Sequence, residues 1–187
     1  MLTLLLAATT LVAQAHDDDD DDVALDLRAG TYQIGGSATA NVALGPLVDP
    51  EGSGTDIYLL LRPTGGYFVT DNTLLYLGID VLLDDAEGSQ VGFGAFAGVD
   101  YFLGGEWARP YVGVGIGYGT RQLDDSPQIY ATDDVITASL SAGLALPVSD
   151  HIALDFGAEF NYNFVFENGD SWMTIPMGYT GVRAFFR

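Results

Sequence analysis

The chain has 187 residues, of which 48% are hydrophobic. Six Arg, no Lys and 26 acidic residues give a formal net charge of −20, which argues against nucleic acid as a partner because binding phosphates requires Lys and Arg. The sequence contains no Cys, so disulfides and thiolate metal sites are excluded. With 24 Gly, ten Tyr and ten Phe, the composition favours strands and turns over helices.

The first 15 residues, MLTLLLAATTLVAQA, form an apolar stretch that ends in Ala13-Gln14-Ala15. An apolar core followed by an A-x-A site is typical of a secretory signal peptide, so we predict residues 1–15 to be a signal that is cleaved after Ala15. The positive residues that usually precede such a core are missing here. The alternative is a short buried helix.

An acidic tract follows, with His16 and then six Asp at residues 17–22. Adjacent like charges repel one another, so we predict a disordered acidic leader over residues 16–22. Clustered carboxylates could bind divalent cations weakly, although the Gly-punctuated spacing of an EF-hand is absent. No apolar run after residue 15 reaches the roughly 18 residues that a membrane-spanning helix needs.

Residues 23–187 alternate between apolar and polar or small side chains in eight segments. The clearest segment is 151–164, HIALDFGAEFNYNF, in which every second residue is apolar or aromatic. Successive side chains of an extended chain point to opposite faces, so this pattern predicts a strand, and one much longer than the usual five or six residues. The eight predicted strands span residues 23–37, 55–67, 73–83, 91–103, 109–123, 134–147, 151–164 and 172–186.

The predicted connections alternate in length. Those after the second, fourth and sixth strands are short, whereas those after the first, third, fifth and seventh are longer and more acidic. Short turns at one end and long loops at the other are typical of outer-membrane barrels, with the long loops outside the cell. Both termini would then face the periplasm.

The two faces of the strands differ in charge. One face is predicted to point into the barrel and carries Asp26, Arg28, Arg62, Asp80, Asp100, Asp155, Glu159 and Arg183, interspersed with Gly rows that would leave room for the Arg side chains. An eight-stranded barrel is just wide enough for side chains to fill it, and buried charges persist when they are paired. The other face is uncharged, with aromatic residues near the strand ends at Tyr67, Phe93, Tyr101, Tyr118, Phe164 and Phe186. This division favours an eight-stranded antiparallel up-and-down transmembrane β-barrel over a soluble barrel of the lipocalin kind.

Two segments resemble a known family. RPTGGYFVTDNTLLYLGIDV resembles the second hairpin of the small outer-membrane β-barrel family, which includes OmpX-type and OmpA-type barrels. The matching positions are Pro63, Gly66, Tyr67, Phe68, Asp71 and Asn72. The end, GYTGVRAFFR, resembles the family's C-terminal assembly signal, in which the barrel-insertion machinery recognises a final aromatic residue; Phe186 would be that residue, although Arg187 follows it. The resemblance covers residues 23–187 and implies a Gram-negative outer-membrane protein.

No catalytic, cofactor-binding or metal-binding residue is predicted. A nucleophilic site would need His151 beside Ser149 or Ser141, with an acid such as Asp150. His151 falls at a predicted periplasmic turn, whereas the lipid-modifying barrels that this fold resembles act at the outer leaflet. The Gly-rich YVGVGIGYG alternates with apolar residues on a strand and precedes no helix, so it is not a dinucleotide fingerprint.

The sequence therefore predicts an integral outer-membrane protein with a structural or surface-interaction role, a polar plugged interior and acidic extracellular loops at 84–90 and 123–134. The alternatives are a narrow channel for small solutes and, less favoured, a lipid-modifying enzyme. The expected partners are outer-membrane lipid, lipopolysaccharide and the barrel-assembly machinery. We expect a monomer without a cofactor.

Overall fold

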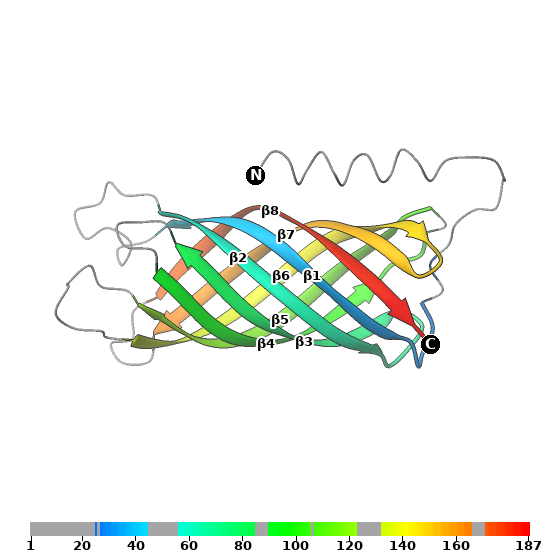
Figure 1. Cartoon of the computed structure of the whole chain (residues 1–187), viewed down its shortest axis with the longest axis horizontal. Helices are drawn as coiled ribbons and strands as arrows, with labels where there is room; N and C mark the ends of the chain where they lie inside the picture. Colours follow the sequence, from blue (N-terminus) through cyan, green and yellow to red (C-terminus); the bar gives the residue numbers. More distant parts are fainter. Residues whose placement is uncertain are drawn as a thin grey trace.

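Eight antiparallel strands close into a barrel (Figure 1). The computed structural model describes residues 25, 27–44, 56–84, 90–105, 107–122, 132–165 and 171–187, so the predicted signal peptide and acidic leader lie outside the described residues. The strands are β1 (Tyr32–Leu44), β2 (Asp56–Phe68), β3 (Thr73–Asp84), β4 (Gln90–Phe102), β5 (Arg109–Gln122), β6 (Thr132–Ser149), β7 (Ile152–Val165) and β8 (Ser171–Phe186). Each strand pairs with the next along the chain, and β1 pairs with β8 to close the ring. The described residues contain no helix long and apolar enough to span a membrane.

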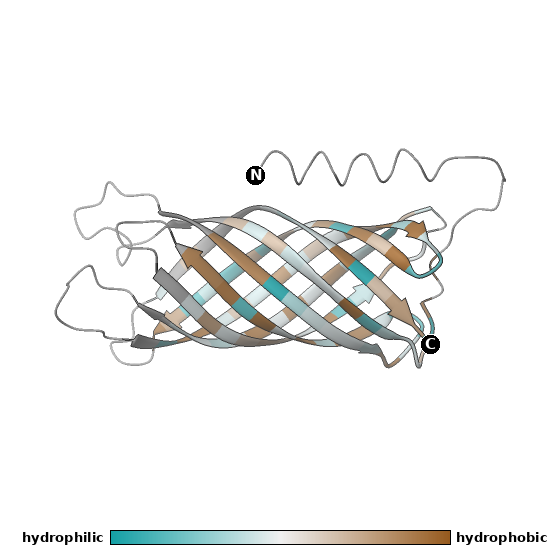
Figure 2. Cartoon of the chain, in the orientation of Figure 1, coloured by the Kyte–Doolittle hydropathy of each residue, from teal (hydrophilic) through white to brown (hydrophobic). Residues whose placement is uncertain are grey.

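Alternating burial divides every strand into an inward and an outward face. In β7, Ala153, Asp155 and Glu159 are buried while Phe156 and Phe160 are exposed, as the sequence pattern predicted. Figure 2 shows the same alternation as brown and pale or teal positions along the strands. Among the outward side chains that the structure describes on the strands, only Asp134 is charged, and it lies near the end of β6 that follows residues 123–131. A surface this apolar is unfavourable in water and suited to hydrocarbon.

The two ends of the barrel differ in their connections. Residues 69–72, 103–108 and 150–151 join strands at the end where β1 begins and β8 stops, with Tyr32 paired to Phe186; we call this end the turn rim. Residues 45–55, 85–89, 123–131 and 166–170 join strands at the opposite end, the loop rim. The short connection predicted after the second strand is confirmed as a turn at residues 69–72: the Thr70 hydroxyl accepts hydrogen bonds from the backbone N–H groups of Asn72 (3.3 Å) and Thr73 (3.0 Å).

The prediction for the first strand is wrong at both ends. β1 begins at Tyr32 instead of Val23 and continues to Leu44. Gly30 adopts a φ of 94°, which favours Gly, and the Thr31 N–H donates to the Arg28 carbonyl, so the chain turns before the strand starts. Arg28 is consequently exposed and not on an inward strand face. Asp26, the other early charge predicted to point inward, lies outside the described residues.

The segment before β1 closes the turn rim from inside. Leu25 and Leu27 are only 1% and 4% exposed, because both insert into the barrel mouth instead of alternating along a strand. They belong to an apolar cluster that we call the apolar plug: Leu25, Leu27, Phe68, Leu74, Phe102, Tyr111, Ala145, Ala153, Tyr179 and Phe185. Within it the Phe68 ring lies 5.5 Å from Phe102 and 6.1 Å from Phe185 between centroids. Burying this much apolar surface fixes the N-terminal segment at the barrel mouth.

Candidate functional site

The interior nearer the loop rim is organised around one guanidinium, which we call the Arg62 cluster. Arg62 lies on β2 and is 5% exposed. Its Nε and Nη2 donate to Asp80 on β3 (2.5 and 3.1 Å), and its Nη1 donates to both oxygens of Glu159 on β7 (3.0 and 2.7 Å). The Phe96 ring covers the guanidinium, with its centroid 3.8 Å from Cζ, and Tyr76 stacks on Phe96. The carboxylates thus pair with the edges of the Arg62 guanidinium, and the aromatic ring covers one of its faces.

A second guanidinium organises the layer nearer the turn rim, the Arg183 cluster. Arg183 on β8 donates from Nε to Asp155 (2.7 Å) and from Nη1 to Asp100 (2.8 Å). Tyr111 donates to the other oxygen of Asp155 (2.5 Å), and its hydroxyl also contacts that of Tyr179. The Arg183 guanidinium lies over the Tyr111 ring at 4.5 Å. This cluster rests directly on the apolar plug, to which Tyr111 and Tyr179 belong.

Both clusters cross the lumen. Asp100 and Arg183 lie on β4 and β8, which stand opposite one another in the eight-stranded ring, and Arg62 and Glu159 lie on strands that do not pair. Such ties are possible because an eight-stranded barrel is narrow enough for side chains from opposite walls to meet. Together the two clusters hold two Arg and four carboxylates, whereas three Arg and five carboxylates were predicted.

Small residues on the inner wall make room mainly for rings. A Cβ added to Gly115 would lie 2.0 Å from Cζ of Phe96, and one added to Gly98 would lie 2.4 Å from Cζ of Tyr76. Among the described Gly residues, only Gly78 makes the predicted kind of room for an Arg in the Arg62 cluster, with Cγ of Arg62 3.1 Å from its added Cβ. The Gly rows therefore let the aromatic rings cover the guanidinium groups.

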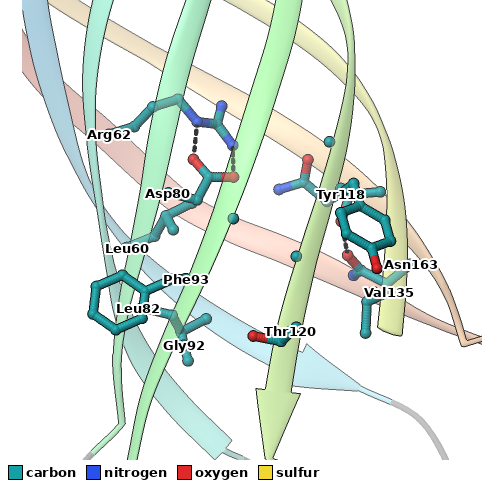
Figure 3. A pocket seen from close by; sticks show the side chains of 15 residues that line it. Leu60, Arg62, Asp80, Leu82, Gly92, Phe93, Tyr118, Thr120, Val135 and Asn163 are labelled. Atoms are coloured by element: carbon teal, nitrogen blue, oxygen red, sulfur yellow. Dashed lines mark hydrogen bonds and ion pairs between the residues drawn. The ribbon is translucent and has the colours of Figure 1, made fainter. Parts of the chain in front are cut away.

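Small cavities lie beside the clusters, among them one on each side of Arg62. The first, of about 90 Å³, lies on the loop-rim side of Arg62 and is lined by residues that include Asp80, Thr137, Asn161 and Asn163 (Figure 3). A space of this size holds about three water molecules. The second, of about 40 Å³, lies between the clusters and includes Arg62 and Arg183 in its lining. Because Arg62 lines both, its side chain stands between the two spaces.

Six of the eight predicted inward charges are thus assembled in the interior, namely Arg62, Asp80, Asp100, Asp155, Glu159 and Arg183. Sequence reasoning did not assign a role to the rings that cover them, Tyr76, Phe96, Tyr111 and Tyr179. Each has the same parity along its strand as an inward charge or Gly, and that shared parity is the signal that could have identified them.

The structure does not assemble the alternative hydrolytic site. His151 is exposed in the turn after β6, where its backbone N–H donates to the Ser149 hydroxyl at 3.3 Å. Ser141 instead lines the cavity between the two clusters, inside the barrel. Among the described residues no group of three His, Cys, Asp or Glu side chains is placed to hold a metal ion.

Comparison with known proteins agrees with this architecture. Solved structures with the same fold include Neisserial surface protein A (TM-score 0.66, 16% identity, covering 84% of this chain and 99% of that one) and the N-terminal β-barrel domain of Pseudomonas aeruginosa OprF (0.56, 19%, 84% and 98%). Ail of Yersinia pestis is a third (0.53, 13%, 84% and 99%). No curated protein matches the sequence. The family described as "Outer membrane protein beta-barrel domain" matches residues 2–179, and the chain therefore belongs to this family of Gram-negative outer-membrane barrels.

Proposed function

We propose that this outer-membrane barrel is closed to solutes and has a structural or surface-interaction role. The observation that carries the proposal is the filled lumen: two Arg-centred clusters cross it, and the apolar plug blocks its turn rim. A channel for small solutes would need a continuous polar path. In its place the described part of the interior holds cavities of about 90 and 40 Å³ with Arg62 between them.

Planar-bilayer recording of the purified protein tests this proposal. We expect no steady conductance, because opening a path would require breaking ion pairs buried on both sides of Arg62. The matched variant is Arg62→Met, which removes the side chain between the two cavities. A steady open level in the unaltered protein that is abolished or altered by replacing Arg62 or Asp100 would refute a closed barrel and favour the channel.

The proposed orientation places the turn rim in the periplasm and the loop rim outside the cell. Connections at the loop rim, residues 45–55, 85–89, 123–131 and 166–170, contain acidic residues and no Lys or Arg. We propose that they approach lipopolysaccharide through bridging divalent cations, since hard cations prefer carboxylate and phosphate oxygens. Removing divalent cations should then break the contacts between these connections and lipopolysaccharide in cells that carry the wild-type barrel. It should have no such effect in cells whose barrel carries Asn and Gln in place of these acidic residues.

We also propose that the barrel-assembly machinery recognises the C-terminal strand. The assembled barrel acts as a monomer, carries no cofactor, binds no nucleic acid and has no enzymatic activity. Phe186 is exposed on the outward face of β8 at its very end, where insertion machinery could reach it before β8 pairs with β1. Phe186→Ala should therefore lower the inserted fraction in cells more than it lowers the stability of the refolded barrel.

Lipid A mass spectra test the proposed lack of enzymatic activity. The spectra from cells that carry His151→Ala should be identical with those from cells that carry the wild-type protein.

A further inference from the structure

The charges of the Arg62 cluster do not balance. Its one guanidinium faces two carboxylates, Asp80 and Glu159, which leaves a formal net charge of −1. The Arg183 cluster cannot supply the missing charge, because its single guanidinium also faces two carboxylates. Among the side chains that the structure describes, no other cation pairs with Asp80 or Glu159. An unbalanced charge is costly away from bulk water, so the interior favours the binding of one further positive charge.

The cavity of about 90 Å³ is where this charge fits. Asp80 lines it and its side chain keeps 21% exposure, whereas Glu159 lines the smaller cavity and keeps 12%. In Figure 3, Asp80 binds Arg62 on one side of the cavity and Asn163 lies on the other. A cation beside Asp80 would complete an alternating series of charges that continues through Arg62 to Glu159.

Neutral oxygen atoms in the cavity wall can contribute further ligands. Asn161 on β7 is 6% exposed and lines the cavity, and its Oδ1 is buried without a hydrogen-bond partner. The Thr137 hydroxyl donates its proton to Oδ1 of Asn163 at 2.7 Å, so the Thr137 oxygen is left with lone pairs that can only accept. Buried acceptors without a partner are costly, and hard cations are bound by carboxylate, amide and hydroxyl oxygens.

We propose that this cavity binds one monovalent hard cation, Na⁺, between Asp80 and Asn161. A single positive charge balances the cluster, and the wall offers one carboxylate with neutral oxygen atoms, whereas Ca²⁺ sites usually combine several carboxylates. A space of this size has room for the ion with part of its water shell. Because Arg62 stands between this cavity and the smaller one, the bound ion enters and leaves on the loop-rim side.

Sodium NMR of the purified protein in detergent micelles tests the site. The Na⁺ concentration is varied at constant ionic strength with N-methylglucamine chloride, whose cation is too large for the cavity, and line broadening that saturates reports the bound ion. Asn161→Leu removes an oxygen ligand without changing charge, so it should raise the half-saturating Na⁺ concentration about tenfold or more. The matched control is Thr39→Val, which replaces a buried polar residue of β1 outside the cavity wall and should behave as wild type.

Asp80→Asn tests the charge requirement even if Asn161→Leu does not fold. It leaves Arg62 balanced by Glu159, so the saturable broadening should disappear. The urea midpoint in vesicles, which should rise with Na⁺ for the wild-type protein, should become independent of Na⁺ in this variant. Saturable broadening that neither substitution changes would overturn the proposal, and so would its absence from the wild-type protein. Displacement of Na⁺ by Ca²⁺ at a lower concentration would overturn the assignment to a monovalent cation.

Discussion

Replacing Arg62 by Met should destabilise the barrel by about 3 kcal/mol. The change removes four hydrogen bonds of 2.5–3.1 Å and leaves Asp80 and Glu159 as neighbouring charges without a cation. Breaking a buried ion pair by removing one partner costs about 3–5 kcal/mol. The Asp80 and Glu159 side chains retain 21% and 12% exposure beside the larger cavity, so water offsets part of the loss and the lower end of the range applies. Reversible urea unfolding in lipid vesicles, followed by fluorescence of the two Trp residues, measures the difference.

Two companion variants separate charge from geometry. Arg62→Lys keeps the charge but loses the planar fork that binds both carboxylates, so it should fall between wild type and Arg62→Met. Combining Arg62→Met with Asp80→Asn and Glu159→Gln removes every uncompensated charge and should recover most of the lost stability. The reasoning is refuted if Arg62→Met unfolds within 0.5 kcal/mol of wild type, or if the triple variant is no more stable than the single one.

Two further predictions concern the inner and outer faces of the wall. Gly115→Ala should cost about 1–3 kcal/mol, because its Cβ would lie 2.0 Å from the Phe96 ring that covers Arg62, whereas Gly65→Ala, with nothing closer than 4.0 Å, should cost markedly less in the same unfolding assay. Equal losses would contradict the role given to Gly115. Ile116→Arg, exposed midway along β5, should cost about 2–4 kcal/mol in vesicles, and Thr120→Arg, nearer the loop rim, about 0–1 kcal/mol. Similar values at both positions would place the hydrocarbon band elsewhere.

Alternation was a sufficient guide to the two faces of the strands that separate lipid from lumen, although it did not predict that β1 continues beyond Ser37 to Leu44. In β7 the two faces meet such different surroundings that a shift by one residue would expose Asp155 and Glu159 to hydrocarbon, so pattern and structure agree throughout the strand. The same rule failed before Tyr32. Leu25 and Leu27 alternate as a strand would, but their partners are the rings of the apolar plug, which come from distant parts of the chain. Local spacing does not distinguish these two reasons for burying every second residue.

The ion pairs inside the lumen could not be predicted from the sequence, for a related reason. The alternation of side chains along each strand predicted that Arg62, Asp100 and Glu159 point inward. It does not predict the position of each side chain along the barrel axis. The position along the axis depends on how far strands that are not neighbours are shifted relative to one another. This shift brings Arg62 to Glu159 and not to Asp100. The number of charges on the inward face therefore predicted that the lumen is filled. It did not predict which charged side chains pair with one another.

Both guanidinium groups hold together strands that are far apart in the chain. Arg62 and Glu159 are separated by 97 residues and Asp100 and Arg183 by 83, so we expect these pairs to form late, as β1 joins β8. Interactions absent from the folding transition state slow unfolding without speeding folding. Parting the seam between β1 and β8 would expose unpaired backbone groups to hydrocarbon and break these pairs together. We therefore expect the lifetime of the inserted protein to depend on the seam between β1 and β8 that closes the barrel.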